Sequence, residues 1–255
     1  MRPLRAALAI LVLPLAGCFQ IASTITVRPD GSALVRDEVT LSGMATLALL
    51  EDEKGEGGVS KAQLQARAAA LGPGVTLVGL DRRDDGFTAV YSVPDVGRLR
   101  YTVPDLPVGD DDGDETIADA SLDLTFAFDG GRPAVLRVVV PEEEAPDAPD
   151  AEPMTAAERA EAAQGLRIVR ALLGDARVVV EVAVEGRVVE TDAAFRDSFI
   201  VTVYDVGFDA LLDAIEENPE LMGEGEPPVG QLRTLLAGRE GVRLQEPGTV
   251  TVRFE

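Results

Sequence analysis

The stretch FQIASTITVRPDGSALVRDEVTL, residues 19–41, is the part of the sequence that decides the predicted fold. Apolar and polar residues alternate over 19–28 and again over 35–41, which is the period of a β-strand with one buried face. Between them, residues 29–32 read PDGS, and Gly31 can adopt the positive φ that a tight turn requires. These residues predict an antiparallel β-hairpin with one apolar face.

Strand and helix signals continue along the rest of the chain. Ser60 and Gln63 form a capping box for a helix over 60–71, which Gly72 ends. Further helices are predicted over 43–53, 208–215 and 229–237, and from a second capping box at Thr155 to Gly174. Further strands are predicted over 75–80, 87–93, 122–128, 134–140, 177–184, 188–193, 199–204, 242–245 and 250–254.

Turn residues between these strands predict further hairpins. Gly130-Gly131 joins one pair of strands, Glu185-Gly186 joins the strands over 177–184 and 188–193, and the last two strands form a closing hairpin. The expected fold class is α+β, with two related modules of antiparallel strands and short helices packed on one face.

The two modules are proposed from an acidic, proline-rich segment and from an internal repeat. Residues 141–153, PEEEAPDAPDAEP, read as a linker between a module at 18–140 and another at 154–255. Three short patterns recur with nearly constant spacing, and chance similarity is the alternative explanation. The matched pairs are 55–57 with 223–225, 63–64 with 231–232, and 74–77 with 241–244. The sheets of the two modules could also join, which would make the linker a surface loop.

The N-terminus has the pattern of a signal peptide. Arg2 and Arg5 precede an apolar run over 6–16, which is too short to span a bilayer. Leu15-Ala16-Gly17-Cys18 follows and resembles the lipobox of bacterial lipoproteins. We therefore expect residues 1–17 to be a lipoprotein signal peptide that is removed before Cys18.

Cys18 is the predicted lipidation site and the only cysteine in the chain, so it cannot form an internal disulfide. The lipobox resemblance implies a diacylglyceryl group on its sulfur and membrane anchoring through several acyl chains. Phe19, where some lipoproteins have aspartate, implies by the same resemblance an outer-membrane location facing the periplasm. The expected partner is thus the membrane, reached through the lipid on Cys18.

Composition excludes several classes of function. The net charge of −22 makes binding to nucleic acid phosphates unfavourable. The chain has no histidine, so a serine hydrolase with an imidazole base is excluded and the general case for an enzyme is weak. No Walker loop, dinucleotide fingerprint or zinc-ligand spacing is present, and we expect no cofactor.

Clusters of carboxylates are the remaining chemical candidates. The run over 110–115, DDDGDE, could bind a cation weakly, but it departs from the calcium-loop pattern and reads better as a solvated loop. Asp192, Asp205 and Asp209 lie near strand ends, where acid/base work is one interpretation and capping of strand ends is the stronger one. We assign no catalytic or metal-binding residue.

The hairpin over 18–41, with its TVRPDGS turn, resembles bacterial envelope lipoproteins and opens as the LppM-like group does. The segments over 182–193, 201–212 and 250–254 are similar to a wider family of such lipoproteins. The resemblance implies a role in the envelope and, more weakly, a lipid-like ligand.

The sequence leads to three hypotheses. The first is a lipid-anchored, non-catalytic binding or interaction module for an unknown envelope protein or ligand. The second is a carrier of an apolar or lipid-like ligand between sheet and helices. The third is a carboxylate-dependent hydrolase, which would require two facing acids in a cleft.

Overall fold

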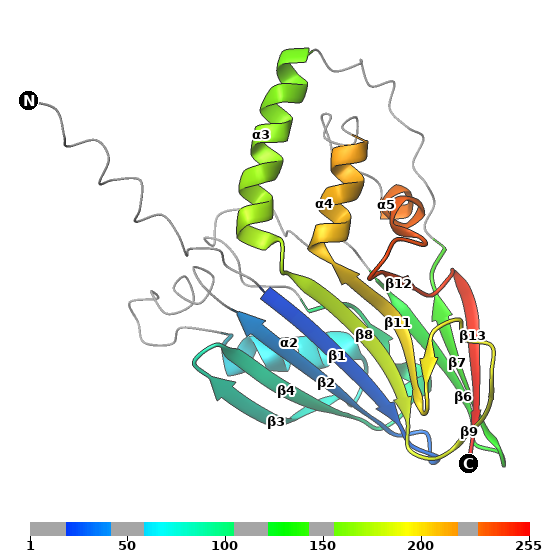
Figure 1. The fold of residues 1–255 in the computed structure, drawn as a ribbon. Coiled ribbons are helices and arrows are strands. Elements are labelled where there is room, and N and C mark those ends of the chain that lie inside the picture. The colour runs from blue at the N-terminus through cyan, green and yellow to red at the C-terminus, as the bar shows by residue number, and fades with distance from the viewer. Residues whose placement is uncertain (1–18, 42–58, 105–121, 143–155, 219–228) are drawn as a thin grey trace, which may run out of the picture.

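A computed structural model describes residues 19–41, 59–104, 122–142, 156–218 and 229–255 (Figure 1). The first three segments contain β1 (Phe19–Val27), β2 (Ala33–Leu41), α2 (Lys61–Leu71), β3 (Thr76–Arg83), β4 (Gly86–Val93), the 3-10 helix η1 (Val96–Arg98), β5 (Arg100–Tyr101), β6 (Leu124–Asp129) and β7 (Ala134–Val140). The last two contain α3 (Ala156–Leu173), β8 (Arg177–Val184), β9 (Val188–Thr191), β10 (Arg196–Asp197), β11 (Ile200–Gly207), α4 (Phe208–Glu217), α5 (Val229–Leu236), β12 (Arg243–Leu244) and β13 (Gly248–Phe254).

This element content confirms the α+β class, with mainly antiparallel sheets and a few short helices. Several sequence predictions fall on residues outside the described segments. They are the signal peptide, Cys18, the helix over 43–53, the acidic run over 110–115, the cap at Thr155 and most of the linker.

The first hairpin forms as predicted. β1 and β2 pair from Phe19↔Leu41 to Val27↔Ala33, and alternate residues of both strands are buried. The turn holds Gly31 at φ 85°, where an added Cβ would come within 2.8 Å of the Phe128 ring. The turn therefore needs glycine both for its backbone conformation and for this close approach.

The described strands form two sheets, which we name sheet A and sheet B. Sheet A has the order β10-β11-β8-β1-β2-β4-β3, with β12 pairing to β11, and sheet B has the order β5-β6-β7-β13-β9. β1 occupies the middle of the sheet A path, with three strands on each side.

Both sheets contain strands from both sides of the predicted linker. β1 pairs in parallel with β8, from Gln20↔Arg177 to Val27↔Val184, and β7 pairs antiparallel with β13. Of the two arrangements that the sequence left open, the joined sheets are the one observed. The predicted modules therefore share one core instead of each enclosing its own.

Two predicted hairpins are wrong for the same reason. β8 and β9 are joined at Glu185-Gly186 but do not pair, because β8 lies in sheet A and β9 pairs with β13 in sheet B. Likewise β12 pairs with β11, while β13 pairs with β7 and β9. Each turn crosses from one sheet to the other, and a local turn signal does not reveal that the strands after it have distant partners.

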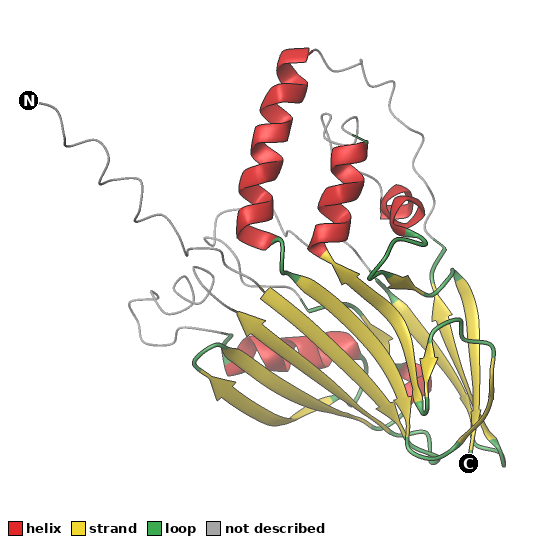
Figure 2. Cartoon of the chain, viewed as in Figure 1, coloured by secondary structure: helices red, strands yellow, loops and turns green. Residues whose placement is uncertain are grey.

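The helices fall into two groups (Figure 2). α2 begins with the predicted capping box of Ser60 and Gln63 and packs its buried Leu64, Ala68 and Leu71 into the main core. α3, α4 and α5 instead project past the end of sheet A at which β1 and β8 begin (Figure 1). α3 packs on α4 and α4 on α5. Among the described residues, no helix has the length and hydropathy to cross a membrane.

One apolar core unites the two sheets and α2. It contains residues from nearly every strand, including Ile25, Val35, Tyr91, Leu136, Val182 and Phe254. A smaller cluster at the start of β1 joins Phe19, Ile21, Val39, Leu41 and Ala176. A third cluster, of Val206 on β11, Ala214 on α4, Leu236 on α5 and Val242, lies where α4 and α5 meet sheet A.

Candidate functional site

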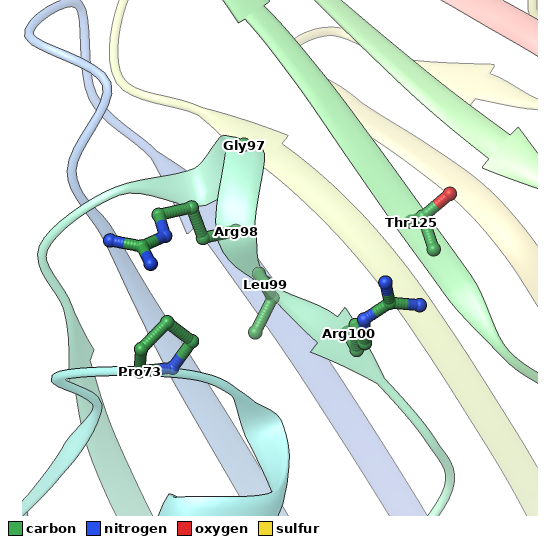
Figure 3. Close-up of a pocket in the computed structure, with 6 residues that line it drawn as sticks. All are labelled: Pro73, Gly97, Arg98, Leu99, Arg100 and Thr125. Atoms are coloured by element: carbon green, nitrogen blue, oxygen red, sulfur yellow. The ribbon is translucent and has the colours of Figure 1, made fainter.

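A pocket of about 340 Å³ lies between the end of α2 and the segment from η1 to β5 (Figure 3). Its walls are formed by Pro73, Gly97, Arg98, Leu99, Arg100 and Thr125. Figure 3 shows the Arg98 side chain on the Pro73 side and the Arg100 side chain on the Thr125 side, with Leu99 between them.

Local backbone geometry fixes these walls. Gly72 ends α2 at φ 146°, and an added Cβ there would lie 2.7 Å from the carbonyl oxygen of Arg98. The amide of Gly97 donates to Oδ1 of Asp95 at 3.0 Å, which caps η1. Arg100 pairs with Thr125 across β5 and β6. The close approach of Gly72 to Arg98 and the pairing of β5 with β6 therefore hold the walls of the pocket together.

Two guanidinium groups give the pocket its chemical character. Arg98 and Arg100 are exposed, and neither forms an ion pair with another residue of the described segments. A guanidinium presents a planar fork of donors that matches a carboxylate or a phosphate. Leu99 is 1% exposed, so Pro73 is the apolar residue that adds exposed surface, and the pocket suits a small anionic group.

A buried polar network, which we name the Asp37–Arg67 network, joins the elements behind this pocket. Asp37 is 1% exposed, and its Oδ1 accepts from Oγ of Ser23 at 2.7 Å. Nε of Arg67 donates to Oδ2 of Asp37 at 2.8 Å, and Nη2 of Arg67 donates to the carbonyl of Thr102 at 3.0 Å. The network thus ties α2 to β2 on one side and to the end of β5 on the other.

Two buried tyrosines pack beside the network. Tyr91 and Tyr101 are fully buried, and their hydroxyls have no hydrogen-bond partner among the described residues. Burial, reinforced by the charge of Asp37, raises the pKa of Tyr91 to about 12 and raises that of Tyr101 as well. The Arg67 guanidinium carbon lies 5.7 Å from the centre of the Tyr101 ring, which is a cation–π distance.

The three aspartates suggested by the sequence are not brought together as one site. Oδ1 of Asp192 accepts from the Thr251 amide at 2.7 Å, so this side chain ties the end of β9 to β13. Asp205 is 4% exposed and accepts two bonds from Arg177, at 2.7 and 2.8 Å. Asp209 is exposed and lies 3.6 Å from Arg170. Each has a structural partner of its own.

Glu181 is a titratable residue that sequence reasoning missed. Burial, followed by the charge of Asp205, raises its pKa. Its position opposite Thr202 depends on the β8–β11 register, which contains a bulge and carries no sequence signal. Among the described residues, no three His, Cys, Asp or Glu side chains are grouped to hold a metal ion.

Comparisons with known proteins add little to this geometry. No protein-family model matches the chain, and no curated protein is similar to it. Among solved structures, the folded domain of LppM from Mycobacterium tuberculosis, determined by NMR, is similar over 95% of this chain and 94% of that chain. The sequence identity is 11% and the TM-score is 0.31.

Removing the carboxylate of the network tests its contribution to stability. We expect Asp37→Ala to lower the free energy of unfolding by about 3 kcal/mol or more, because Arg67 would keep a mostly buried charge without its partner. Arg187→Ala, which breaks an exposed pair with Glu255, should cost less than about 1 kcal/mol. Urea unfolding measures both, and equal costs would contradict the assignment.

The buried tyrosines predict a loss of stability in alkali. Unfolded tyrosine ionises near pH 10, whereas Tyr91 in the folded chain keeps its proton to about pH 12. The tyrosine contribution to stability should therefore be unchanged below about pH 10 and be lost as the pH rises towards about 12. Urea midpoints measured across this range should fall less steeply for Tyr91→Phe than for the wild type. Parallel curves would show that Tyr91 titrates normally.

Proposed function

We propose that this chain is a lipid-anchored lipoprotein of the bacterial envelope whose folded domain is a non-catalytic binding module. The proposed anchor rests on the sequence around Cys18, directly before β1. The lipobox-like LAGC ends at Cys18, and β1 begins at the next residue, Phe19. A signal peptide removed before Cys18 would leave the lipidated residue adjacent to the first strand, with all of the folded domain retained.

The pocket lined by Arg98 and Arg100, which we name the arginine pocket, supports binding as the activity. Arg98 and Arg100 each present a cationic fork, on opposite sides of the pocket (Figure 3), and either is suited to bind an anionic group. A carboxylate or phosphate on an envelope protein or on a smaller ligand has the required chemistry. Without histidine, the chain supplies no imidazole base beside the pocket, which favours binding over catalysis.

The alternative of a carrier for an apolar ligand has less support. Such a carrier needs a cavity between apolar faces. The described apolar side chains of both sheets and α2 instead pack against one another as one continuous core. The hydrolase alternative needs two facing carboxylates. It is weakened because Asp205, whose charge raises the pKa of Glu181, accepts two hydrogen bonds from Arg177.

Mass spectrometry of the protein from native membranes tests the anchor. The mature chain should begin at Cys18 and carry a lipid adduct on that residue, and Cys18→Ala should abolish both cleavage and lipid. An intact leader, or a mature chain with a free thiol, would refute the anchored function.

Titration with inorganic phosphate and with citrate tests the pocket. We expect saturable NMR shifts of the amides around Arg98, Arg100 and Thr125, and their loss in an Arg98→Ala/Arg100→Ala variant. Arg196→Ala serves as the matched control, because Arg196 is also an exposed arginine but lies on β10. Shifts that persist in the double variant would exclude the pocket as the anion site.

A further inference from the structure

Two residues that line the arginine pocket also lie on the face of sheet B that is turned away from the core. Arg100 and Thr125 are direct partners across β5 and β6, so their side chains are on the same face of the sheet. The next residues of the two strands, Tyr101 and Leu124, are buried in the main core. Arg100 and Thr125 therefore belong to the opposite face, which we name the outer face.

The outer face continues from the pocket across sheet B with mainly short side chains. Thr125 pairs with Val139 on β7, and Val139 pairs with Thr249 on β13. Val139 is 37% exposed, and Thr249 is exposed as well. The next row along the strands is formed by Ala127, Arg137 and Thr251. The pocket thus lies at one end of an open surface that crosses three strands.

Arg137 places a second positive charge on the outer face. It is exposed and has no ion pair within the described residues, whereas Arg253 in the following row lies 3.5 Å from Glu190. Arg100 and Arg137 are separated by two strand spacings across the sheet and by two residues along it. Their Cα atoms therefore lie about 12 Å apart. Two guanidinium groups at this separation can bind two carboxylates of one ligand.

The spacing and the short side chains favour an extended acidic peptide as that ligand. In an extended chain, two side chains four positions apart point to the same side and are separated by about 13 Å. Each carboxylate could then form two parallel hydrogen bonds with one arginine. The rings of a polysaccharide pack best on aromatic side chains, and the two rows described above contain none.

We propose that the arginine pocket and the outer face of sheet B together bind an extended acidic segment of a partner protein. Arg100 holds one carboxylate of this segment and Arg137 holds the second. The segment crosses β6 and β7 over Thr125 and Val139, whose short side chains let its backbone approach the sheet. The inference rests on the proposed binding function of the pocket and deepens it by naming the chemistry of the partner.

Fluorescence anisotropy of a labelled synthetic peptide tests the second contact. The peptide has two glutamates four positions apart among serines and threonines, and it is titrated with the full-length lipoprotein in detergent. We expect Arg137→Ala to weaken its binding roughly threefold to tenfold, because one charged contact is lost. Arg196→Ala is the matched control and should leave the affinity unchanged, since Arg196 is an exposed arginine on β10 of sheet A.

A charge swap tests whether Arg137 touches the peptide directly. Arg137→Glu should lose the acidic peptide and recover binding to a peptide in which one of the two glutamates is replaced by lysine. Equal affinity of the wild type and Arg137→Ala for the acidic peptide would overturn the inference. Tighter binding of polygalacturonate than of the peptide would overturn it as well, because the ligand would then be a polysaccharide.

Titration with inorganic phosphate separates this inference from the proposed function of the pocket. Arg137→Ala should keep the phosphate-induced NMR shifts around Arg98 and Arg100, because Arg137 does not line the pocket. Phosphate shifts together with peptide binding that ignores Arg137 overturn the extended site alone. Absence of both phosphate and peptide binding overturns the pocket and the extended site together.

Discussion

The pairing of β1 on both of its edges is the constraint on which the rest of the structure depends. One edge is satisfied locally, because the five-residue connection 28–32 returns the chain as β2. The other edge is satisfied by β8, more than 100 residues later in the sequence, in parallel register from Gln20 to Val27. A parallel neighbour needs a crossover connection, and here the crossover contains β2 to β7 and α3. The second half of the chain is thereby built onto the first instead of folding beside it.

The elements that could be predicted from sequence are those determined by residues close together in the chain. Hairpins closed by short turns, such as β1–β2 and β6–β7, and the capping box of α2 were predictable because all their determinants lie within a few residues. The partners of β9 and β13 were not, because each strand turns its apolar face to a sheet assembled from distant segments. The two regions matched in the predicted repeat share a helix-then-strand order, α2–β3 and α5–β12, although the matched residues 55–57 and 223–225 lie outside the described segments.

The Asp37–Arg67 network did leave a signal in the sequence. In the two alternating strands, Ser23 and Asp37 occupy positions of the apolar, inward face, and the hairpin register makes them direct cross-strand partners. A polar pair at matched inward positions indicates a buried network that needs a third partner, which α2 supplies as Arg67. The arginine pocket left no such signal, because Arg98 and Arg100 become neighbours of Pro73 only when α2 packs on the sheet. Buried ion pairs contribute little net stability when compared with apolar packing, so the value of this one lies in fixing where α2 and β5 meet.

The positions of the proposed anchor and of the pocket bear on which kind of ligand is within reach. The amide of Val96, at the start of η1, donates to the carbonyl of Gly31, in the turn at the far end of β1–β2 from Phe19. The length of β1 separates these ends by roughly 26 Å, at about 3.3 Å per residue. A lipid attached beside Phe19 would therefore hold the η1 wall of the pocket away from the bilayer. Under the proposed anchor, anionic headgroups of the same membrane would lie beyond the reach of Arg98, so the proposed ligand would be an anionic group in the aqueous space.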